Sequence, residues 1–165
     1  MTMAKPWEIY AWLWVTDGQG YPNLDPERLT AELGLSPTEV WRVGQPFGLR
    51  NRIATVNSWA LESEIDRTAT PDEHASSILE RLSQDWPKAT RILSQFMAGL
   101  TIPIKIYGSR TPPIQLESAT VRKLAELGAS LDVDLYYLPE PEFSESGECV
   151  HCGFTDVSGS LQRMD

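Results

Sequence analysis

The sequence predicts an α+β fold, in which helices pack on a four-stranded, mainly antiparallel sheet. Four short segments alternate apolar and polar residues, which is typical of strands. Helical segments with clear start and stop signals lie between these strands. Strands and helices do not alternate regularly enough to favour a doubly wound parallel sheet.

The first strand and the first helix are both marked by local signals. Residues 7–15 place aliphatic side chains on one face, whereas Trp12 and Trp14 lie on the other. Asp25 can cap the free amides of a helix, and the proline that follows it suits the first helical position. Gly34 is expected to end this helix.

The next segment predicts little regular structure before the second strand. Ser36 and Glu39 have the spacing of a capping box, which indicates a helix start or only a turn. Residues 45–57 are predicted to form a long loop. Residues 58–65 alternate again and predict the second strand.

The clearest helix start in the chain is at Thr70, which is followed by proline and then by Glu73. We expect His74, in the first turn, to be a solvated surface residue. Pro87 forces a break, and a further helix is expected to run through Met97.

The last part of the chain predicts a strand, a helix and a strand. Residues 101–107 form the third strand, and Pro103 suggests an edge or strand-start position for it. A helix over residues 118–127 is expected to bury Val121 and two leucines. Residues 131–138 form the fourth strand.

One short motif occurs twice. Ala31-Glu32-Leu33-Gly34 recurs as Ala125-Glu126-Leu127-Gly128, each within a strand–helix–strand segment. The chain is therefore predicted to contain two such halves in a ferredoxin-like arrangement, joined by residues 70–99. The alternative to a duplication is that the motif recurs by chance, because many helices end in Leu-Gly.

Residues 1–138 are predicted to form a single α+β domain, followed by residues 139–165 as an acidic, mobile C-terminal tail. Cys149 and Cys152 in this tail have the spacing of half a zinc site. A closed site needs two more ligands, and no second cysteine pair exists. We therefore interpret them as free thiols, and no metal or cofactor is predicted.

The charge is strongly acidic and unevenly distributed. The formal net charge is -9, and residues 114–165 contain 10 acidic and 3 basic residues. Nucleic-acid affinity depends largely on neutralising phosphates, so this charge argues against nucleic acid and anionic membranes as partners. It allows a basic protein partner. Because no signal-peptide pattern is present, we expect a cytoplasmic protein. The sequence is also compatible with a homo-oligomer.

No nucleophile elbow, phosphate-binding loop or His-Glu-x-x-His motif is present. Asp132 and Asp134 share one strand face, where they are either an acid–base pair or ordinary solvated acids. Trp12 and Trp14 are either covered by a second helix layer or exposed as interface anchors.

The motifs, taken in order, resemble the bacterial family called domain of unknown function 4279, over about Trp7 to Leu138. The residues that carry the resemblance are Leu24-Asp25-Pro26-Glu27, Leu33-Gly34-Leu35-Ser36-Pro37, Gly44, Ser58-Trp59-Ala60-Leu61-Glu62-Ser63, Leu124-Ala125-Glu126-Leu127-Gly128 and Asp134-Leu135-Tyr136. The resemblance implies no catalytic residues. It implies a bacterial or phage source, where small acidic proteins often bind partners and include immunity proteins that mask a toxin.

Three functional hypotheses follow. The first is a non-enzymatic protein-binding module, specifically an immunity or antitoxin-like inhibitor of a basic partner. The second is a small-ligand-binding regulatory domain, with a pocket between residues 45–57 and the sheet in which Arg50 or Arg52 holds an anion. The third is an enzyme that uses Asp132, Asp134 or a cysteine-bound metal.

Overall fold

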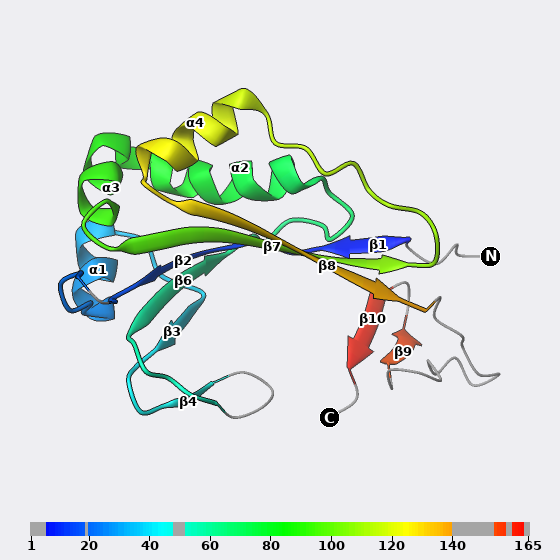
Figure 1. The fold of residues 1–165 in the computed structure, drawn as a ribbon, viewed down its shortest axis with the longest axis horizontal. Helices are drawn as coiled ribbons and strands as arrows, with labels where there is room; N and C mark the ends of the chain where they lie inside the picture. Colours follow the sequence, from blue (N-terminus) through cyan, green and yellow to red (C-terminus); the bar gives the residue numbers. More distant parts are fainter. Residues whose placement is uncertain (1–5, 19, 48–51, 140–153, 158–159, 164–165) are drawn as a thin grey trace.

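The computed structural model describes residues 6–18, 20–47, 52–139, 154–157 and 160–163. Its largest feature is a six-stranded, mainly antiparallel sheet with helices packed on one face (Figure 1). The α+β class is therefore confirmed, whereas the predicted number of strands in the sheet, four, is wrong.

Six strands make up the main sheet. They are β1 (Trp7–Ile9), β2 (Trp12–Thr16), β3 (Glu39–Trp41), β6 (Ser58–Glu62), β7 (Met97–Tyr107) and β8 (Ser130–Leu138). The hydrogen-bonded order is β1-β7-β2-β6-β3, and all of these neighbours are antiparallel. β8 pairs with β7 in parallel.

β1 and β2 lie in one line along β7. The pairing continues without a shift from Trp7 opposite Ile106 to Thr16 opposite Met97. The gap between them faces Pro103, whose carbonyl accepts a hydrogen bond from the Tyr10 amide (3.1 Å). Proline has no N–H to return, so the ladder is interrupted there. The predicted edge or strand-start position of Pro103 is therefore wrong, because β7 is paired on both sides and Pro103 lies in its interior.

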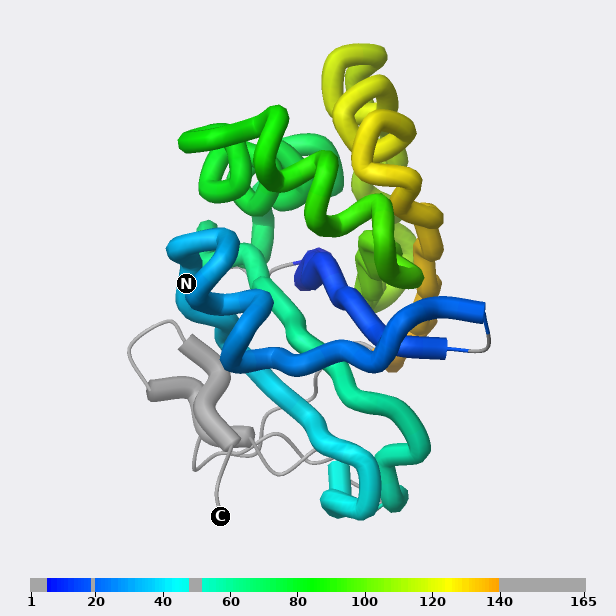
Figure 2. The backbone as a smooth tube through the Cα atoms, turned by 90° about the vertical axis from the view of Figure 1, so that its left-hand side faces the viewer, coloured from blue at the N-terminus to red at the C-terminus, as the bar shows by residue number. Residues whose placement is uncertain are grey.

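The helices are α1 (Pro26–Leu33), α2 (Pro71–Leu82), the short 3-10 helix η1 (Ser83–Asp85), α3 (Trp86–Leu93) and α4 (Ser118–Glu126). Figure 2, turned by 90° from Figure 1, shows α2, α3 and α4 together on one side of the sheet. α1 belongs to the same layer, since Trp59, fully buried on the helix side, donates from Nε1 to Oγ1 of Thr30 (3.1 Å).

The helix ends follow the local signals in the sequence. Asp25 accepts hydrogen bonds from the amides of Glu27 and Arg28, and Thr70 forms a complete capping box. Gly34 and Gly128 have φ angles of 66° and 67°, in the left-handed region that favours glycine. The repeated Leu-Gly motif is thus a helix stop signal in both places.

The core lies between the sheet and the helix layer. Alternate residues of the strands point toward the helices, as predicted for residues 7–15. The largest fully buried side chains are Trp59, Ile9, Leu13, Leu61, Ile78, Leu79, Leu93, Leu100, Ile102, Ile104, Ile106 and Leu127. Val121 is 50% exposed instead of buried, because α4 turns Thr120 and Leu124 inward.

The segment between α1 and β6 contains strands that were not predicted. Glu39 to Trp41 forms β3 rather than a helix or turn, since it pairs with β6. The predicted loop contains a second small sheet, in which β4 (Pro46–Phe47) pairs with β5 (Arg52–Ile53). Met97, predicted in a helix, begins β7.

Near the C-terminus, β9 (Phe154–Val157) pairs with β10 (Ser160–Arg163) in a third, two-stranded sheet. Cys149 and Cys152 lie outside the described residues. Among the helices of the described part, none has the length and apolar character needed to cross a membrane.

Candidate functional site

The face of the main sheet opposite the helices carries a group of aromatic side chains. Trp12 and Trp14 point to this side because their neighbour Leu13 points into the core. Both are half-buried, and Trp41 on β3 is half-buried as well. Within the described ranges, no helix covers this face (Figures 1 and 2).

These tryptophans line a shallow depression, which we call the aromatic groove. The sheet supplies one wall, and the β4–β5 segment supplies the other. The lining residues are Trp12, Trp14, Thr16, Trp41, Phe47, Arg52, Ile53, Ala54, Thr55, Val56 and Ser58. The volume of the groove is about 440 Å³. Such a volume is within the range of small-molecule sites and also accommodates a large apolar side chain.

The floor of the groove is held by close packing. Nε1 of Trp14 donates a hydrogen bond to Oγ1 of Thr101 on β7 (3.0 Å). Gly99 lies directly beneath the indole, and a Cβ atom added there would be 2.3 Å from Cζ2 of Trp14. The absence of a side chain at residue 99 therefore lets the indole lie over β7.

The opposite wall is ordered by ring contacts. The ring centroids of Trp41 and Phe47 are 5.8 Å apart, with planes inclined at 56°. The guanidinium carbon of Arg52 lies 5.5 Å from the centroid of Phe47. Arg52 thus places a positive charge at the rim of an otherwise apolar surface.

Hydrogen bonds continue the pairing of the β4–β5 segment toward the main sheet and join it to the end of β2. The amide of Gly44 donates to the carbonyl of Ala54, and the amide of Ala54 donates to that of Gln45 (2.8 Å each). Asn57 accepts from the Val43 amide (3.1 Å) with its side chain and donates from its own amide to Asp17 (2.9 Å). The wall is therefore built into the fold rather than loosely attached.

Carboxylates occupy the same sheet face beside the tryptophans. Glu39 pairs in register with Ala60, and Glu62 pairs with Trp12. Burial raises the pKa of Glu39 above 4.5, the negative charge of Glu62 adds to this, and a hydrogen bond from Trp41 opposes it. The two acids thus give this face negative potential near the aromatic groove.

The structure brings together only some of the predicted site residues. Trp12, Trp14 and Arg52 all line the aromatic groove. Asp132 lies on the same sheet face, next to Thr101, which is itself next to Trp12.

Asp134 is two residues further along β8, opposite Pro103 and outside the groove. Arg50 lies outside the described residues. Sequence reasoning missed Trp41, although the alternation of Glu39, Val40 and Trp41 was a signal for a short strand.

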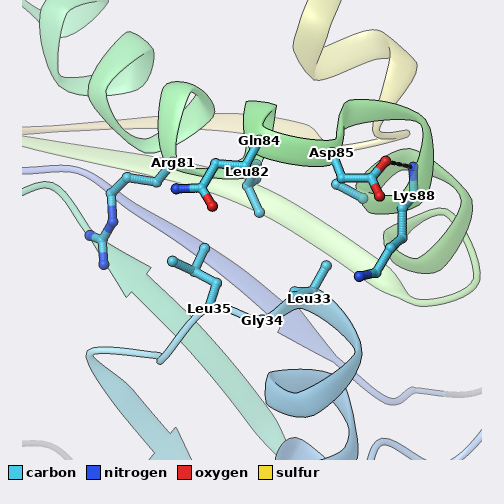
Figure 3. Close-up of a pocket in the computed structure, with 9 residues that line it drawn as sticks. Leu33, Gly34, Leu35, Arg81, Leu82, Gln84, Asp85 and Lys88 are labelled. Carbon is cyan, nitrogen blue, oxygen red and sulfur yellow. Dashed lines mark hydrogen bonds between the residues drawn. The ribbon is translucent and has the colours of Figure 1, made fainter.

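A second hollow, of about 250 Å³, lies where the end of α1 approaches η1 and α3 (Figure 3). Arg81, at its edge, donates to the carbonyl of Glu62 (3.1 Å) and lies 3.7 Å from Glu64. Asp85 accepts from the backbone amide of Lys88 as a helix cap. These polar groups therefore serve the fold, and they do not converge on a common point in the hollow.

A third hollow, of about 280 Å³, contains Ser63 and His74. Oγ of Ser63 is 2.7 Å from Nδ1 of His74, and Ser77 donates to Ser63 (3.2 Å). A serine next to a histidine is the arrangement of a nucleophile and its base.

His74 is buried, with only 1% of its surface exposed, so the prediction that it is a solvated surface residue is wrong. Burial lowers the pKa of His74, and the carbonyl of Asp66 and the charge of Glu73 oppose this.

Among the described residues, no cluster of histidine, cysteine and acidic side chains is suited to hold a metal ion. The family model described as "Domain of unknown function (DUF4279)" matches residues 7–138 of the chain. No match was found among curated proteins or among solved structures.

Proposed function

We propose that this chain, which belongs to the DUF4279 family, is a non-enzymatic protein-binding module whose aromatic groove receives an apolar side chain of the partner. The observation that carries the proposal is the position of Trp12, Trp14 and Trp41, half-buried around one groove on a sheet face that the described helices leave open. Tryptophan is among the residues that dominate binding energy at protein interfaces.

The charge of the molecule supports a basic partner. The net charge is -9, and Glu39 and Glu62 lie beside the aromatic groove. Complementary charge speeds association and disfavours acidic competitors. Within this class we propose the role of an immunity or antitoxin-like inhibitor that covers a basic surface of its partner.

The experiment selects partners from a displayed peptide library with the full chain, then compares variants. We expect Trp41→Ala and Trp12→Ala each to weaken binding by about thirtyfold or more, because anchor residues of this kind contribute at least about 2 kcal/mol. Trp86→Ala is the matched control, since Trp86 lies in the helix layer and bonds to Glu126. Selected peptides that bind the Trp12→Ala/Trp41→Ala double variant as tightly as the parent chain would exclude the groove.

A small anionic ligand is the second candidate, and the position of Arg52 favours it. The groove is lined by aromatic rings, and the Arg52 guanidinium stands over Phe47 at its rim. A flat molecule with a carboxylate would fit both features. A thermal-shift screen of planar aromatic carboxylates tests this, with Arg52→Gln expected to abolish any rise in melting temperature. A flat response across the screen removes this candidate.

We also infer that the fold is ferredoxin-like with an added edge strand. Two strand–helix–strand units are interleaved, since β6 lies between β2 and β3, and β2 lies between β6 and β7. This order supports the predicted class but not the predicted halves, because the second unit is β6–α2–β7 and not the segment from residue 101 to residue 138. β8, which follows α4, extends the sheet beyond β7.

A further inference from the structure

β8 forms one edge of the main sheet. Within the described residues it pairs with β7 alone, over its full length from Ser130 to Leu138. The carbonyl of Leu138 accepts from Gly108, which directly follows β7, so it points toward that strand (3.3 Å). Because backbone groups alternate along a strand, the N–H and C=O groups of residues 131, 133, 135 and 137 point to the open edge.

The side chains of β8 are unusually apolar for such an edge. The exposed ones are Leu131 (46%), Leu135 (43%), Tyr136 (50%), Tyr137 (66%) and Leu138 (37%). Proteins commonly protect an open edge with lysine, proline or a bulge, because an unprotected edge pairs with other chains. Residues 130–138 contain neither lysine nor proline. The only charges on β8 are those of Asp132 and Asp134.

The two aspartates lie on the open face of the sheet. Asp132 is in register with Thr101, and Asp134 is in register with Pro103. The other face of β8 is formed by alternate apolar residues, among them Leu131 and Leu135. A strand that pairs with this edge therefore meets carboxylates on one face and aliphatic side chains on the other.

The charge distinguishes between two possible occupants. A second copy would bring Asp132 and Asp134 against their own counterparts, between two chains that each carry a net charge of -9. Like charges across a strand pair are destabilising. A basic segment instead gains complementary charge at the same two positions.

We propose that the edge of β8 accepts an extended segment of a basic partner as an additional strand of the sheet. Lysine or arginine at alternate positions would face Asp132 and Asp134, and apolar residues between them would pack against Leu131 and Leu135. This mode of recognition combines main-chain hydrogen bonds with side-chain selection. The inference rests on the proposed protein-binding function and adds a second contact surface, separate from the aromatic groove.

The test uses the full chain and a labelled nine-residue peptide that alternates lysine and valine, with fluorescence anisotropy as the readout. We expect saturable binding that weakens with added salt. The Asp132→Asn/Asp134→Asn variant should bind at least about tenfold more weakly, in line with the cost of losing close charge pairs. Glu80→Gln/Glu117→Gln is the matched control, because it removes the same charge from exposed positions of the helix layer and should change binding little.

Two further measurements separate strand pairing from simple charge attraction. Amide hydrogen exchange should slow at residues 131, 133, 135 and 137 when the peptide binds. A peptide with N-methyl groups at alternate residues, which blocks the main-chain hydrogen bonds, should not bind. Equal binding of this blocked peptide, or of one that alternates glutamate and valine, would overturn the proposal.

The outcomes also distinguish this inference from the proposed function. Trp12→Ala/Trp41→Ala should leave binding of the lysine–valine peptide unchanged. If that peptide fails to bind while groove-dependent partners still do, only the β8 inference is wrong. Light scattering could instead show a homodimer that is more stable in the Asp132→Asn/Asp134→Asn variant. That result would mean that the edge of β8 pairs with a second copy of the chain and not with a basic segment.

Discussion

His74 is a titratable side chain held in a place that opposes its charged form. It lies on α2 and contacts Ser63 at the end of β6 through a 2.7 Å hydrogen bond. Burial lowers the pKa of His74 below 6.5, its ordinary value, despite the nearby charge of Glu73. The neutral imidazole therefore links a helix to the sheet.

This environment predicts a loss of stability in mild acid. Because the pKa in the folded state is lower than 6.5, the unfolded chain binds the proton more readily. The contribution of His74 is fully present above pH 6.5 and is lost as the pH falls below that value. The free energy of unfolding should therefore be lower at pH 5 than at pH 7.5, because protonation of His74 favours the unfolded chain.

The measurement is urea unfolding at pH 7.5 and pH 5, with tryptophan fluorescence as the signal. The His74→Gln variant is the comparison, because it removes the titrating group and retains a polar side chain. Its free energy of unfolding should change less between the two pH values than that of the parent chain. An equal change in both proteins would show that His74 does not cause the pH dependence.

His74 also illustrates what the sequence could not specify at the scale of residues. The capping box predicts where α2 begins, but it does not indicate which residue of the first turn faces the sheet. Val121 gave the opposite error, since an apolar residue was expected inside and lies outside. Helix rotation is set by tertiary packing, which local signals do not contain.

At the scale of elements, β2 and β7 approach each other closely through Gly99. An added Cβ atom would lie 2.3 Å from Cζ2 of Trp14 and 2.6 Å from Oγ of Ser130. Gly99→Ala should therefore displace the Trp14 indole and lower the free energy of unfolding by about 1–3 kcal/mol, as overpacking commonly does. Denaturant unfolding gives the free energy, and tryptophan emission reports the movement of the ring.

A double-mutant cycle identifies the cause of this cost. In a Trp14→Leu background the long indole is absent, so Gly99→Ala should destabilise the protein less. The same cost in both backgrounds would mean that Trp14 is not the obstacle.

The elements that were predicted correctly are those with local signals. Asp25, Thr70 and the two Leu-Gly stops each act within one helical turn, so the helix boundaries could be read directly. β3 was missed because three residues form a strand only by pairing with β6, a contact distant in sequence. The position of Pro103 was predicted wrongly because the sequence does not show where its missing N–H group would lie. In the structure Pro103 faces the gap between β1 and β2, where no strand needs that hydrogen bond.

In the candidate site, too, the features set by local sequence were predicted and those set by distant contacts were not. The alternation of residues 7–15 predicts that Trp12 and Trp14 share a face, and this is confirmed by the burial of Leu13 between them. The convergence of Trp41 and Phe47 on that face depends on β3 and on the β4–β5 segment. Residues brought together by two unpredicted strands could not be assigned to one groove in advance.

At the scale of the whole molecule, the net charge of -9 is expected to cost stability. Like charges in a compact body repel, and salt reduces this repulsion because the screening length falls from about 30 Å at 0.01 M to about 8 Å at 0.15 M. The melting temperature should therefore rise by about 1–2 °C over this range, which for a chain of this size corresponds to a few tenths of a kcal/mol.

Asp132→Asn/Asp134→Asn should raise the melting temperature at 0.01 M salt and have little effect at high salt. Arg110→Gln, which removes an exposed cation, is expected to act in the opposite direction. Differential scanning calorimetry at both salt concentrations gives all the values. The repulsion argument would be contradicted if the melting temperature changed neither with salt nor on substitution of both aspartates. The expected result means that these carboxylates do not stabilise the fold, in keeping with the proposal that they face a basic segment of a partner.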